Sequence, residues 1–328
     1  MKIGILGAAL SHPAAFARAI RELRIAEVSG IWSSEEDQGR RDRFAAELGL
    51  EIFQSAEQAI DRSDALLVTT ATNEHMSFAL LALSRHKPVF VDKPLATNLA
   101  DASTIVEAAR LNDAALMSCS IRRYTPPFVS IAEQVRSGGA GRPIQAVRFE
   151  PHGVSPGDWQ DRVVTSGGFI FNFGIHVVDT LQLVLGPKAA EVHVFADKIE
   201  FKEVESHDTA VLTVRFANGA VGIGQVVGAM HPNEHIATAP SLCVFCTQNS
   251  YTARLDENQA FEYTGRRLGV SPYYFLLSGV HDTMKAFIRM VETGEPAIPH
   301  GEMLEVVRIL EAARTSAAER RPVVLDGS

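Results

Sequence analysis

The sequence predicts an N-terminal α/β domain with a doubly wound parallel sheet (a Rossmann domain), followed by an α+β domain with a large, mainly antiparallel open sheet. A chain of 328 residues with 46% apolar residues can form two cores. In residues 1–121, short apolar runs alternate with helical patterns, which is typical of βαβ units. In residues 122–328, strands follow one another, and Asn218-Gly219 is typical of a two-residue hairpin turn. We therefore place the domain boundary after residue 121.

The first domain is predicted to begin with a strand over residues 2–6, a tight turn and a helix that ends near Leu23. The later predicted strands cover residues 26–32, 52–53, 65–69, 88–91 and 115–118, and the helices between them cover 41–48, 56–60, 73–84 and 98–111. Open parallel sheets bind ligands at the carboxyl ends of their strands. The loops after these strands are therefore where we expect a cofactor.

The turn after the first strand occupies the place of the dinucleotide motif GxGxxG. Only its first glycine, Gly7, is present, because Ala9 and His12 take the other two places. Alanine still permits a fairly close approach, and a helix N-terminus offers N–H groups to a phosphate. We expect Gly7, Ala9, Leu10 and His12 to contact the cofactor, although His12 could instead cap the turn.

The end of the second strand bears on the choice between NAD and NADP. It carries Ser33, where an acid would normally bind the adenosine ribose. Serine would tolerate a 2′-phosphate, and Arg40 or Arg41 could approach one. Three acids that follow the strand would repel that phosphate: Glu35, Glu36 and Asp37. The sequence therefore leaves the choice open.

Two later loops add polar side chains to the predicted cofactor site. Thr70, Asn73 and His75 follow the fourth strand, although Asn73 could simply cap the next helix. Asp92 and Lys93 follow the fifth strand. The proline after Lys93 restricts the backbone, so its side chain would be held in one orientation, but a solvated lysine is the alternative.

The second domain is predicted to open with a helix over residues 128–137 and a strand over 144–150, followed by one central helix. Further strands are expected over residues 191–199, 208–216, 220–227, 241–248 and 251–255. Two helices, over residues 280–292 and 302–320, and a strand over 322–325 complete the chain. Such runs of strands after a βαβ half are typical of an α+β domain.

The central helix carries polar groups inside an apolar run. If it starts near Asn172, then Asn172, His176 and Asp179 lie on one stripe at i, i+4 and i+7. A histidine on an apolar helix is usually a satisfied core residue, so a catalytic role for His176 depends on its context. Gly167 and Gly168 remove side chains where a ligand or another backbone could come close.

Other polar residues are weaker candidates for the site. Arg123 and Tyr124 lie where the chain leaves the first domain. His152, Asp158 and Trp159 lie in a loop rich in glycine and proline, where they could contact a sugar or simply face solvent.

We predict no metal site in this chain. Cys243 and Cys246 form a CxxC pattern on a predicted strand, where residues three apart point to opposite faces. His231 and His235 have helical spacing, but Pro232 lies between them.

Composition limits the classes of partner. The net charge of −8 and the lack of any Lys/Arg block argue against nucleic acid and anionic membranes. No apolar run approaches the roughly 20 residues of a membrane span, and the N-terminus lacks the pattern of a signal peptide. With only three cysteines, we expect a cytoplasmic protein. The strands near residues 211–227 are more apolar than one buried face requires, so we expect a homodimer or homotetramer through this sheet, on the evidence of Val211, Val221, Ile223, Val226 and Val227.

Several stretches, in order, resemble the glucose-fructose oxidoreductase, inositol dehydrogenase and MocA family over nearly the whole chain. Thr72-Asn73-Glu74-His75 resembles the TPNxxH loop of that family, and Asp92-Lys93-Pro94 resembles its EKP motif. Residues 167–179 resemble its GGxxxDxGxHxxD pattern, with Asn172 in place of aspartate. Its lesser signatures are matched by Arg123-Tyr124-Thr125-Pro126, Gly294-Glu295-Pro296 and Arg321-Pro322-Val323.

The resemblance implies NAD(P)-linked oxidation or reduction of a sugar or polyol. It implies that Lys93 and His176 are the catalytic pair, with Asn172 beside them. An imidazole suits proton transfer from an alcohol, and an ammonium stabilises the alkoxide. Asn172 cannot carry the charge of the usual aspartate, which Asp179 could supply instead. The implied substrate contacts are Lys93, Arg123, Tyr124, His152, Trp159, Asn172 and His176.

Two other functions are compatible with the sequence. One is a regulator or sensor that binds NAD(P) without catalysis, as the departures at Ala9, His12, Ser33 and Asn172 would allow. The other is an enzyme that holds NAD tightly and cleaves a glycosidic bond through a transient ketone, without net oxidation.

Overall fold

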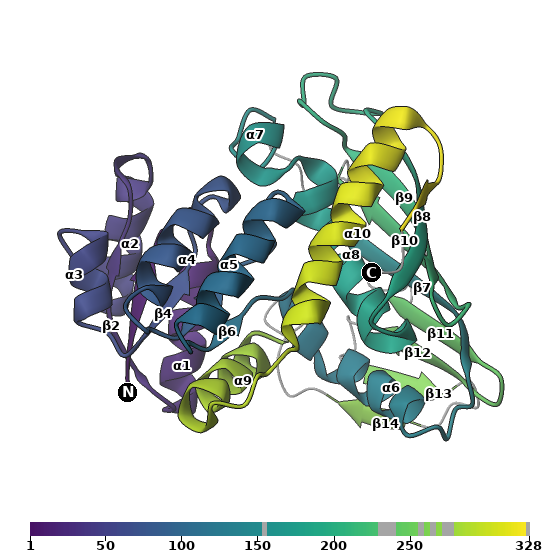
Figure 1. The fold of residues 1–328 in the computed structure, drawn as a ribbon, viewed down its shortest axis with the longest axis horizontal. Coiled ribbons are helices and arrows are strands. Elements are labelled where there is room, and N and C mark those ends of the chain that lie inside the picture. The colour runs from purple at the N-terminus through teal and green to yellow at the C-terminus, as the bar shows by residue number, and fades with distance from the viewer. Residues whose placement is uncertain (153–155, 229–240, 255–258, 263–266, 271–278, 326–328) are drawn as a thin grey trace. The chain divides into compact units, whose positions relative to one another are not determined.

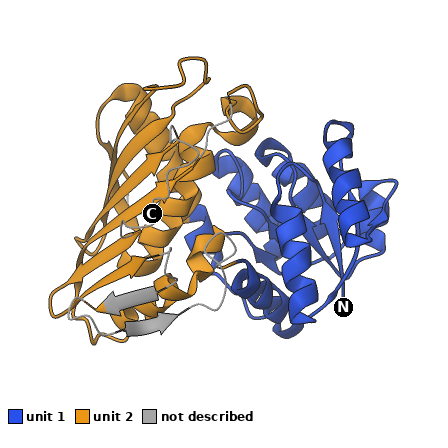
Figure 2. Cartoon of the chain, turned by 180° about the vertical axis from the view of Figure 1, so that it is seen from behind, with its two compact units in different colours: residues 1–119, 280–304 blue, residues 120–279, 305–328 orange. Residues whose placement is uncertain are grey.

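The computed structural model describes residues 1–152, 156–228, 241–254, 259–262, 267–270 and 279–325. The chain forms two compact units, which are coloured separately in Figure 2. Unit 1 comprises Met1–Cys119 and Val280–Leu304, and unit 2 comprises Ser120–Gly279 and Glu305–Ser328. The predicted fold class is confirmed, since one sheet is parallel and the other is mainly antiparallel.

Unit 1 contains a six-stranded parallel sheet in the order β3-β2-β1-β4-β5-β6 (Figure 1). Its strands are β1 (Lys2–Leu6), β2 (Glu27–Trp32), β3 (Glu51–Ile52), β4 (Ala65–Val68), β5 (Val89–Val91) and β6 (Leu116–Met117). Its helices are α1 (His12–Leu23), α2 (Gln38–Leu48), α3 (Ala56–Asp61), α4 (His75–Leu83), α5 (Leu99–Leu111) and α9 (Val280–Thr293), with 3-10 turns η1 (Glu35–Asp37) and η2 (Thr72–Glu74). The strand order reverses beside β1, which is where such sheets bind ligands.

Helix α9 belongs to unit 1, although the predicted boundary placed it in the second domain. The ring centroids of Phe16 in α1 and Phe90 in β5 lie 5.4 Å apart, and those of Phe90 and Phe287 in α9 lie 5.9 Å apart. All three side chains are fully buried. Also in unit 1, His281 Nε2 lies 2.7 Å from a Glu22 carboxylate oxygen. The chain therefore returns to the first core because α9 completes it.

Unit 2 contains a nine-stranded sheet in the order β14-β13-β12-β11-β7-β10-β9-β8-β15. Among the described strand pairs of this sheet, only β7 and β10 pair in parallel. The strands are β7 (Pro143–Pro151), β8 (Ala189–Asp197), β9 (Thr209–Phe216), β10 (Val221–Val227), β11 (Leu242–Cys246), β12 (Ser250–Arg254), β13 (Gln259–Glu262), β14 (Arg267–Val270) and β15 (Val323–Val324). The helical segments are η3 (Ile121–Tyr124), α6 (Pro126–Arg136), α7 (Val163–Ser166), α8 (Phe169–Leu185) and α10 (His300–Glu319), whose first turn belongs to unit 1.

Helix α8 packs closely on β10 because two glycines of that strand leave room for it. A Cβ on Gly224 would collide with the side chain of Val177, and one on Gly222 would lie 2.9 Å from Leu181 Cδ1. Every residue of α8 is buried. The spacing of Gly222 and Gly224 therefore selects the face of the sheet that receives the helix.

The start of α8 differs from the prediction. The helix begins at Phe169, three residues before the predicted start at Asn172. Gly167 and Gly168 adopt φ of 81° and 80°, which side chains disfavour, and a Cβ on Gly167 would lie 2.6 Å from Phe171 Cγ. These glycines make the turn into the helix.

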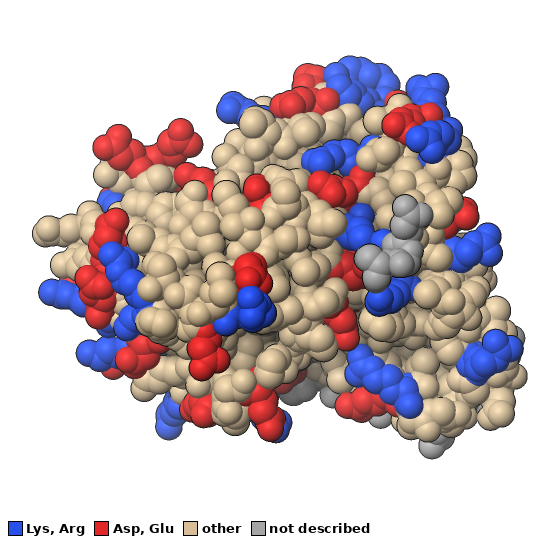
Figure 3. Space-filling view, in the orientation of Figure 1, with Lys and Arg blue, Asp and Glu red and all other residues tan. Residues whose placement is uncertain are grey.

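Two expectations about surface and membrane can be compared with the structure. The stretch Val163–Leu185 is long and apolar enough to cross a membrane, although we expected no such stretch from the sequence. Its 18-residue apolar segment is entirely buried inside the protein. Acidic and basic side chains are interspersed on the face drawn in Figure 3.

Candidate active site

The turn after β1 requires glycine. Gly7 has a φ of 106°, and a Cβ there would lie 2.6 Å from Thr70 Cα. The Gly7 N–H donates to the carbonyl of Trp32 at 2.7 Å, while the hydroxyl of Thr69 donates to the carbonyl of Gly7 at 2.8 Å. The ends of β1, β2 and β4 are thus tied together at the turn, with Ala9 buried beside it. A backbone turn without side chains at this edge fits a dinucleotide.

His12 and Asp92 form a pair at the same edge of the sheet. His12 Nδ1 lies 2.6 Å from Asp92 Oδ2, so the imidazole contacts the loop after β5, and no side-chain cap bond is formed at the start of α1. Burial by itself would raise the pKa of Asp92. The neighbouring His12 and Lys93 lower this pKa by more than burial raises it, so it lies below its ordinary value. Lys93 is buried, and the Lys93-Pro94 peptide bond is cis.

His75 links two loops of the site. Its Nδ1 lies 2.9 Å from the carbonyl oxygen of Pro94, and its Nε2 lies 3.2 Å from that of Thr70. Burial lowers its pKa, and a neutral ring can donate to only one of these oxygens. Asn73 is exposed and makes no capping bond to α4, so the alternative of a helix cap is wrong. His75 holds the loops after β4 and β5 together.

The polar residues predicted on α8 meet the start of unit 2. Asn172, His176 and Asp179 are all buried. His176 Nδ1 lies 2.7 Å from Ser120 Oγ, which also accepts a bond from the Arg122 N–H at 3.1 Å. The Asp179 carboxylate oxygen Oδ2 accepts a hydrogen bond from the Ser120 N–H at 2.9 Å. The ring of His176 is therefore oriented through Ser120.

Asp179 and Arg123 form a buried ion pair. An Arg123 guanidinium nitrogen donates to Asp179 Oδ1 at 2.7 Å, and the Ser120 N–H occupies Oδ2. Asp179 thus holds the segment that carries Ser120. A pair this deeply buried contributes to stability only while both partners are present. This ion pair is a structural explanation for Arg123, and its contact with substrate stays a prediction.

A second buried network adjoins His176. Glu150, at the end of β7, accepts bonds from Arg122 and from Arg148, and its Oε1 lies 3.5 Å from His152 Nε2. Burial by itself would raise the pKa of Glu150. The two guanidiniums lower this pKa by more than burial raises it, so it lies well below its ordinary value. Burial lowers the pKa of Arg148 to about 10. The carboxylate therefore stays charged.

His152 lies against His176. The ring centroids are 5.1 Å apart and the planes differ by 11°, so the two imidazoles are stacked. The structure thus brings two predicted substrate residues together beside Asn172 on α8. Trp159 is half-buried in the turn before α7, where its backbone N–H donates to the Asp158 carboxylate, and Tyr124 is half-buried in η3.

The geometry disfavours a metal ion at this cluster. Glu150, His152 and His176 each offer a ligand atom, and these atoms lie within 4.8 Å of one another. Stacked rings direct their lone pairs into parallel planes, which do not meet at one ion, and Glu150 already binds two guanidiniums. Cys243 and Cys246 occupy alternate faces of β11, while His231 and His235 lie outside the described residues.

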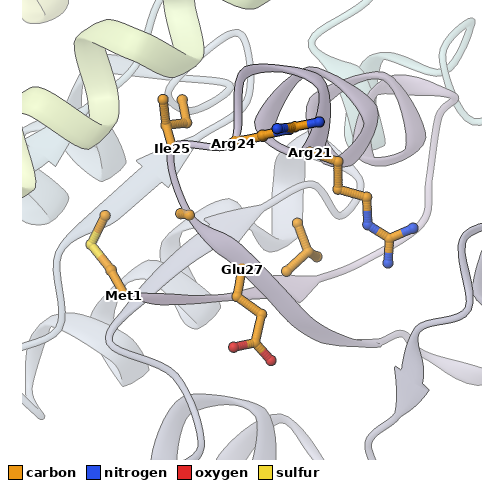
Figure 4. Close-up of a pocket in the computed structure, with 7 residues that line it drawn as sticks. Met1, Arg21, Arg24, Ile25 and Glu27 are labelled. Carbon is orange, nitrogen blue, oxygen red and sulfur yellow. The ribbon is translucent and has the colours of Figure 1, made fainter.

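A separate hollow lies at the opposite edge of the parallel sheet. Its volume is about 510 Å³, and its lining includes Met1, Arg21, Arg24 and Glu27 (Figure 4). These residues lie at the amino ends of β1 and β2 or at the end of α1. Because ligands bind parallel sheets at the carboxyl edge, this hollow is not the cofactor site.

Sequence reasoning missed four residues of the site: Ser120, Arg122, Arg148 and Glu150. One signal was available for Arg148 and Glu150, because two opposite charges at i and i+2 share one face of a strand. That face is the buried one here. Nothing local marks Ser120 as the partner of a histidine 56 residues later.

Comparisons with known proteins cover both units. Residues 1–119 match the model of the oxidoreductase family with an NAD-binding Rossmann fold, and residues 128–252 match that of the GFO/IDH/MocA C-terminal domain. The chain is 30% identical over 278 residues to a myo-inositol 2-dehydrogenase of Thermotoga maritima, covering 80% of each chain.

Solved structures share the fold. A probable dehydrogenase from Thermotoga maritima superimposes with a TM-score of 0.82 at 25% identity, over 99% of this chain and 98% of that one. An oxidoreductase from Agrobacterium radiobacter, crystallised with NAD+, L-tartaric acid and magnesium, gives a TM-score of 0.85 at 18% identity, with the same coverage. The second similarity concerns the fold alone.

Proposed function

Because the chain belongs to the GFO/IDH/MocA oxidoreductase family, we propose that it is an NAD(P)-dependent dehydrogenase for a secondary hydroxyl of an inositol-like polyol or a sugar. The observation that carries the proposal is His176, a buried imidazole held at Nδ1 by Ser120 on an otherwise apolar helix. A histidine that only fills a core would not need polar neighbours such as Asn172 and the stacked His152.

The proposed chemistry gives separate roles to the cofactor, to His176, to Lys93 and to Asn172. A bound nicotinamide accepts or supplies the hydride. His176, with Nδ1 at Ser120, exchanges the hydroxyl proton through Nε2, while Lys93 stabilises the alkoxide and orients the substrate. Asn172 hydrogen-bonds a hydroxyl without adding charge.

The test is a panel of inositols, sugars and sugar alcohols with NAD and with NADP, in which product analysis accompanies the absorbance of reduced cofactor. We expect reduced cofactor with at least one polyol. His176→Ala and Lys93→Ala should each lower kcat by about 100-fold or more, while cofactor binding, followed by fluorescence, stays close to wild type.

His300→Ala is the matched control, because His300 is a half-buried histidine at the start of α10. It should leave kcat unchanged. Wild-type turnover in either catalytic variant would overturn the assigned roles. A product formed without net reduced cofactor would favour the non-redox enzyme, and cofactor binding without any product would favour the sensor. The relatives named as dehydrogenases favour neither alternative.

We also propose a homodimer or homotetramer through the outer face of the unit 2 sheet. Phe195 and Val211 are paired across β8 and β9 on this face and are 70% and 40% exposed. Val221, Ile223 and Val227 are half-buried on the same face of β10, but Val226 points inward and is buried, which corrects its predicted place. Contiguous exposed apolar surface on a sheet is typical of an interface.

Light scattering at micromolar concentration should give a multiple of the 35.6 kDa chain mass. Phe195→Asp should shift the population toward monomer, whereas Arg215→Asp, on the same face of the sheet, should shift it less because it removes no apolar contact. A monomer in the wild-type protein would contradict the proposal.

A further inference from the structure

The carboxyl end of β2 carries no acid, but three carboxylates from neighbouring segments gather near it. Glu36 and Asp37 lie in η1, directly after the strand. Glu74 ends η2, one turn before Phe78 in α4, whose ring centroid lies 5.1 Å from that of Trp32 at the end of β2. Glu74 is half-buried, and its pKa is raised by burial and by the charges of Asp37 and Glu36. Three acids from two loops therefore share one negative field at this edge of unit 1.

The two arginines that the sequence offers for a phosphate here already form bonds within the protein. Arg40 donates to the carbonyl oxygen of Ala8 at 2.8 Å, to that of Ala9, and to Asp37 Oδ1 at 3.1 Å. Arg41 donates to Asp42 through two nitrogens. The guanidinium of Arg40 thus braces the turn after Gly7. The hydroxyl of the buried Ser33 donates to the carbonyl of Ser34 at 3.0 Å.

We propose that Glu36, Asp37 and Glu74 make the enzyme select NAD over NADP, in place of the acid that usually ends the second strand. This inference rests on the proposed function. A 2′-phosphate carries nearly two negative charges and would approach three carboxylates, while Arg40 and Arg41 already bond to carbonyl oxygens or to carboxylates. A ribose hydroxyl can instead donate to a carboxylate, as in other NAD sites.

Arg40 has a positioning role in this arrangement. By binding the carbonyls of Ala8 and Ala9, it holds the turn that would contact the pyrophosphate, and Asp37 holds Arg40. A change at Asp37 would therefore disturb the turn as well as the charge. Glu36 and Glu74 form no ion pair among the described residues, so they are the better sites for a test.

The experiment measures binding of NADH and NADPH by fluorescence titration, which needs no substrate and does not depend on turnover. Wild-type protein at low ionic strength should bind NADH about tenfold or more tightly than NADPH. The double variant Glu36→Gln/Glu74→Gln should reduce that ratio by about fivefold, mainly by tighter NADPH binding. Added salt should reduce the wild-type ratio too, because it screens the carboxylates.

Glu107→Gln on α5 is the matched control, because Glu107 is an exposed carboxylate of unit 1 that forms an ion pair with Arg110 on the same helix. It should leave the ratio unchanged. Equal or tighter binding of NADPH by the wild-type protein would overturn the proposal. An equal effect of Glu107→Gln, or no effect of the double variant, would do the same. If neither cofactor binds, the proposed function fails as well, whereas inactivity with normal NADH selectivity leaves this inference standing.

Discussion

The two units hold their candidate functional residues by different means. Unit 1 uses the backbone: a glycine turn and loops tied by carbonyls, through Gly7, Thr69 and His75. Unit 2 uses buried charged side chains from η3, β7 and α8. Backbone sites tolerate replacement of side chains that do not clash, whereas a buried ion network fails when one partner is removed. The two units should therefore respond differently to mutation and to pH.

This difference can be measured because the chain has two tryptophans, one in each unit: Trp32 in unit 1 and Trp159 in unit 2. Trp32→Phe and Trp159→Phe backgrounds would report the unfolding of each unit separately.

Glu150→Gln should have the largest effect. It leaves Arg122 and Arg148 buried beside a neutral amide, so we expect the free energy of unfolding of unit 2 to fall by about 3 kcal/mol. Urea unfolding followed at Trp159 measures this, and the Trp32 signal should change less. Glu191→Gln, near the exposed Arg215, should cost less than about 0.5 kcal/mol. Equal costs for the two variants would remove the contrast between the units.

Gly7→Ala tests the backbone-built site. With a φ of 106° and Thr70 against the missing Cβ, we expect a loss of about 2 kcal/mol in unit 1 and weaker cofactor binding. The Trp32 transition and an NADH titration measure these. Gly39→Ala in α2 has open space and should be neutral or slightly stabilising. A tolerated alanine at position 7 would show that the turn is not constrained as described.

The pH dependence should separate the units next. The pKa of the buried His75 is lowered, so the unfolded chain takes up that proton first, and unit 1 should lose stability as pH falls below about 6.5. The pKa of Glu150 is also lowered, so its contribution is lost only as pH falls below about 4.5.

Between about pH 7.5 and 5.5, the free energy of unfolding of unit 1 should fall by about 1 kcal/mol less in His75→Gln than in the wild type, as followed at Trp32. Glutamine keeps a donor for one carbonyl but does not titrate in this range. If the loss is the same in the variant, His75 is not its source.

Asn172→Asp should have the smallest effect, and it acts on activity. Its carboxylate would raise the pKa of His176 and shift the pH profile of kcat upward by up to about one unit. A substrate that uses the amide as a donor should show a higher KM, because a carboxylate only accepts. The near-isosteric change should preserve the fold. Identical profiles and KM values would show that Asn172 does not face the reacting centre.

The features predicted well from sequence are those set by local pattern. The parallel sheet of unit 1 and the turn at Gly7 follow from the alternation of strands with helices and from a glycine that the backbone requires. The predicted strand over residues 2–6 matches β1, whereas α8 starts three residues early because Gly167 and Gly168, not Asn172, set its entry. Strands β13 and β14 were not predicted.

The features missed depend on contacts distant in sequence. Ser120 meets His176, and Phe287 packs with Phe90, although the members of each pair lie far apart in the sequence. Local spacing contains no information about such pairs. The roles of Lys93 and His176 stay predictions that rest on the family resemblance and await the variants described above.

The return of residues 280–304 to unit 1 has a consequence for synthesis on the ribosome. The chain passes between the units after residues 119, 279 and 304. A nascent chain that has reached residue 119 lacks α9, and with it Met284, Phe287 and Ile288, which are buried in the finished protein. The cofactor-binding unit therefore cannot complete its core until almost the whole polypeptide has been translated, and an isolated fragment of residues 1–119 should be prone to aggregate.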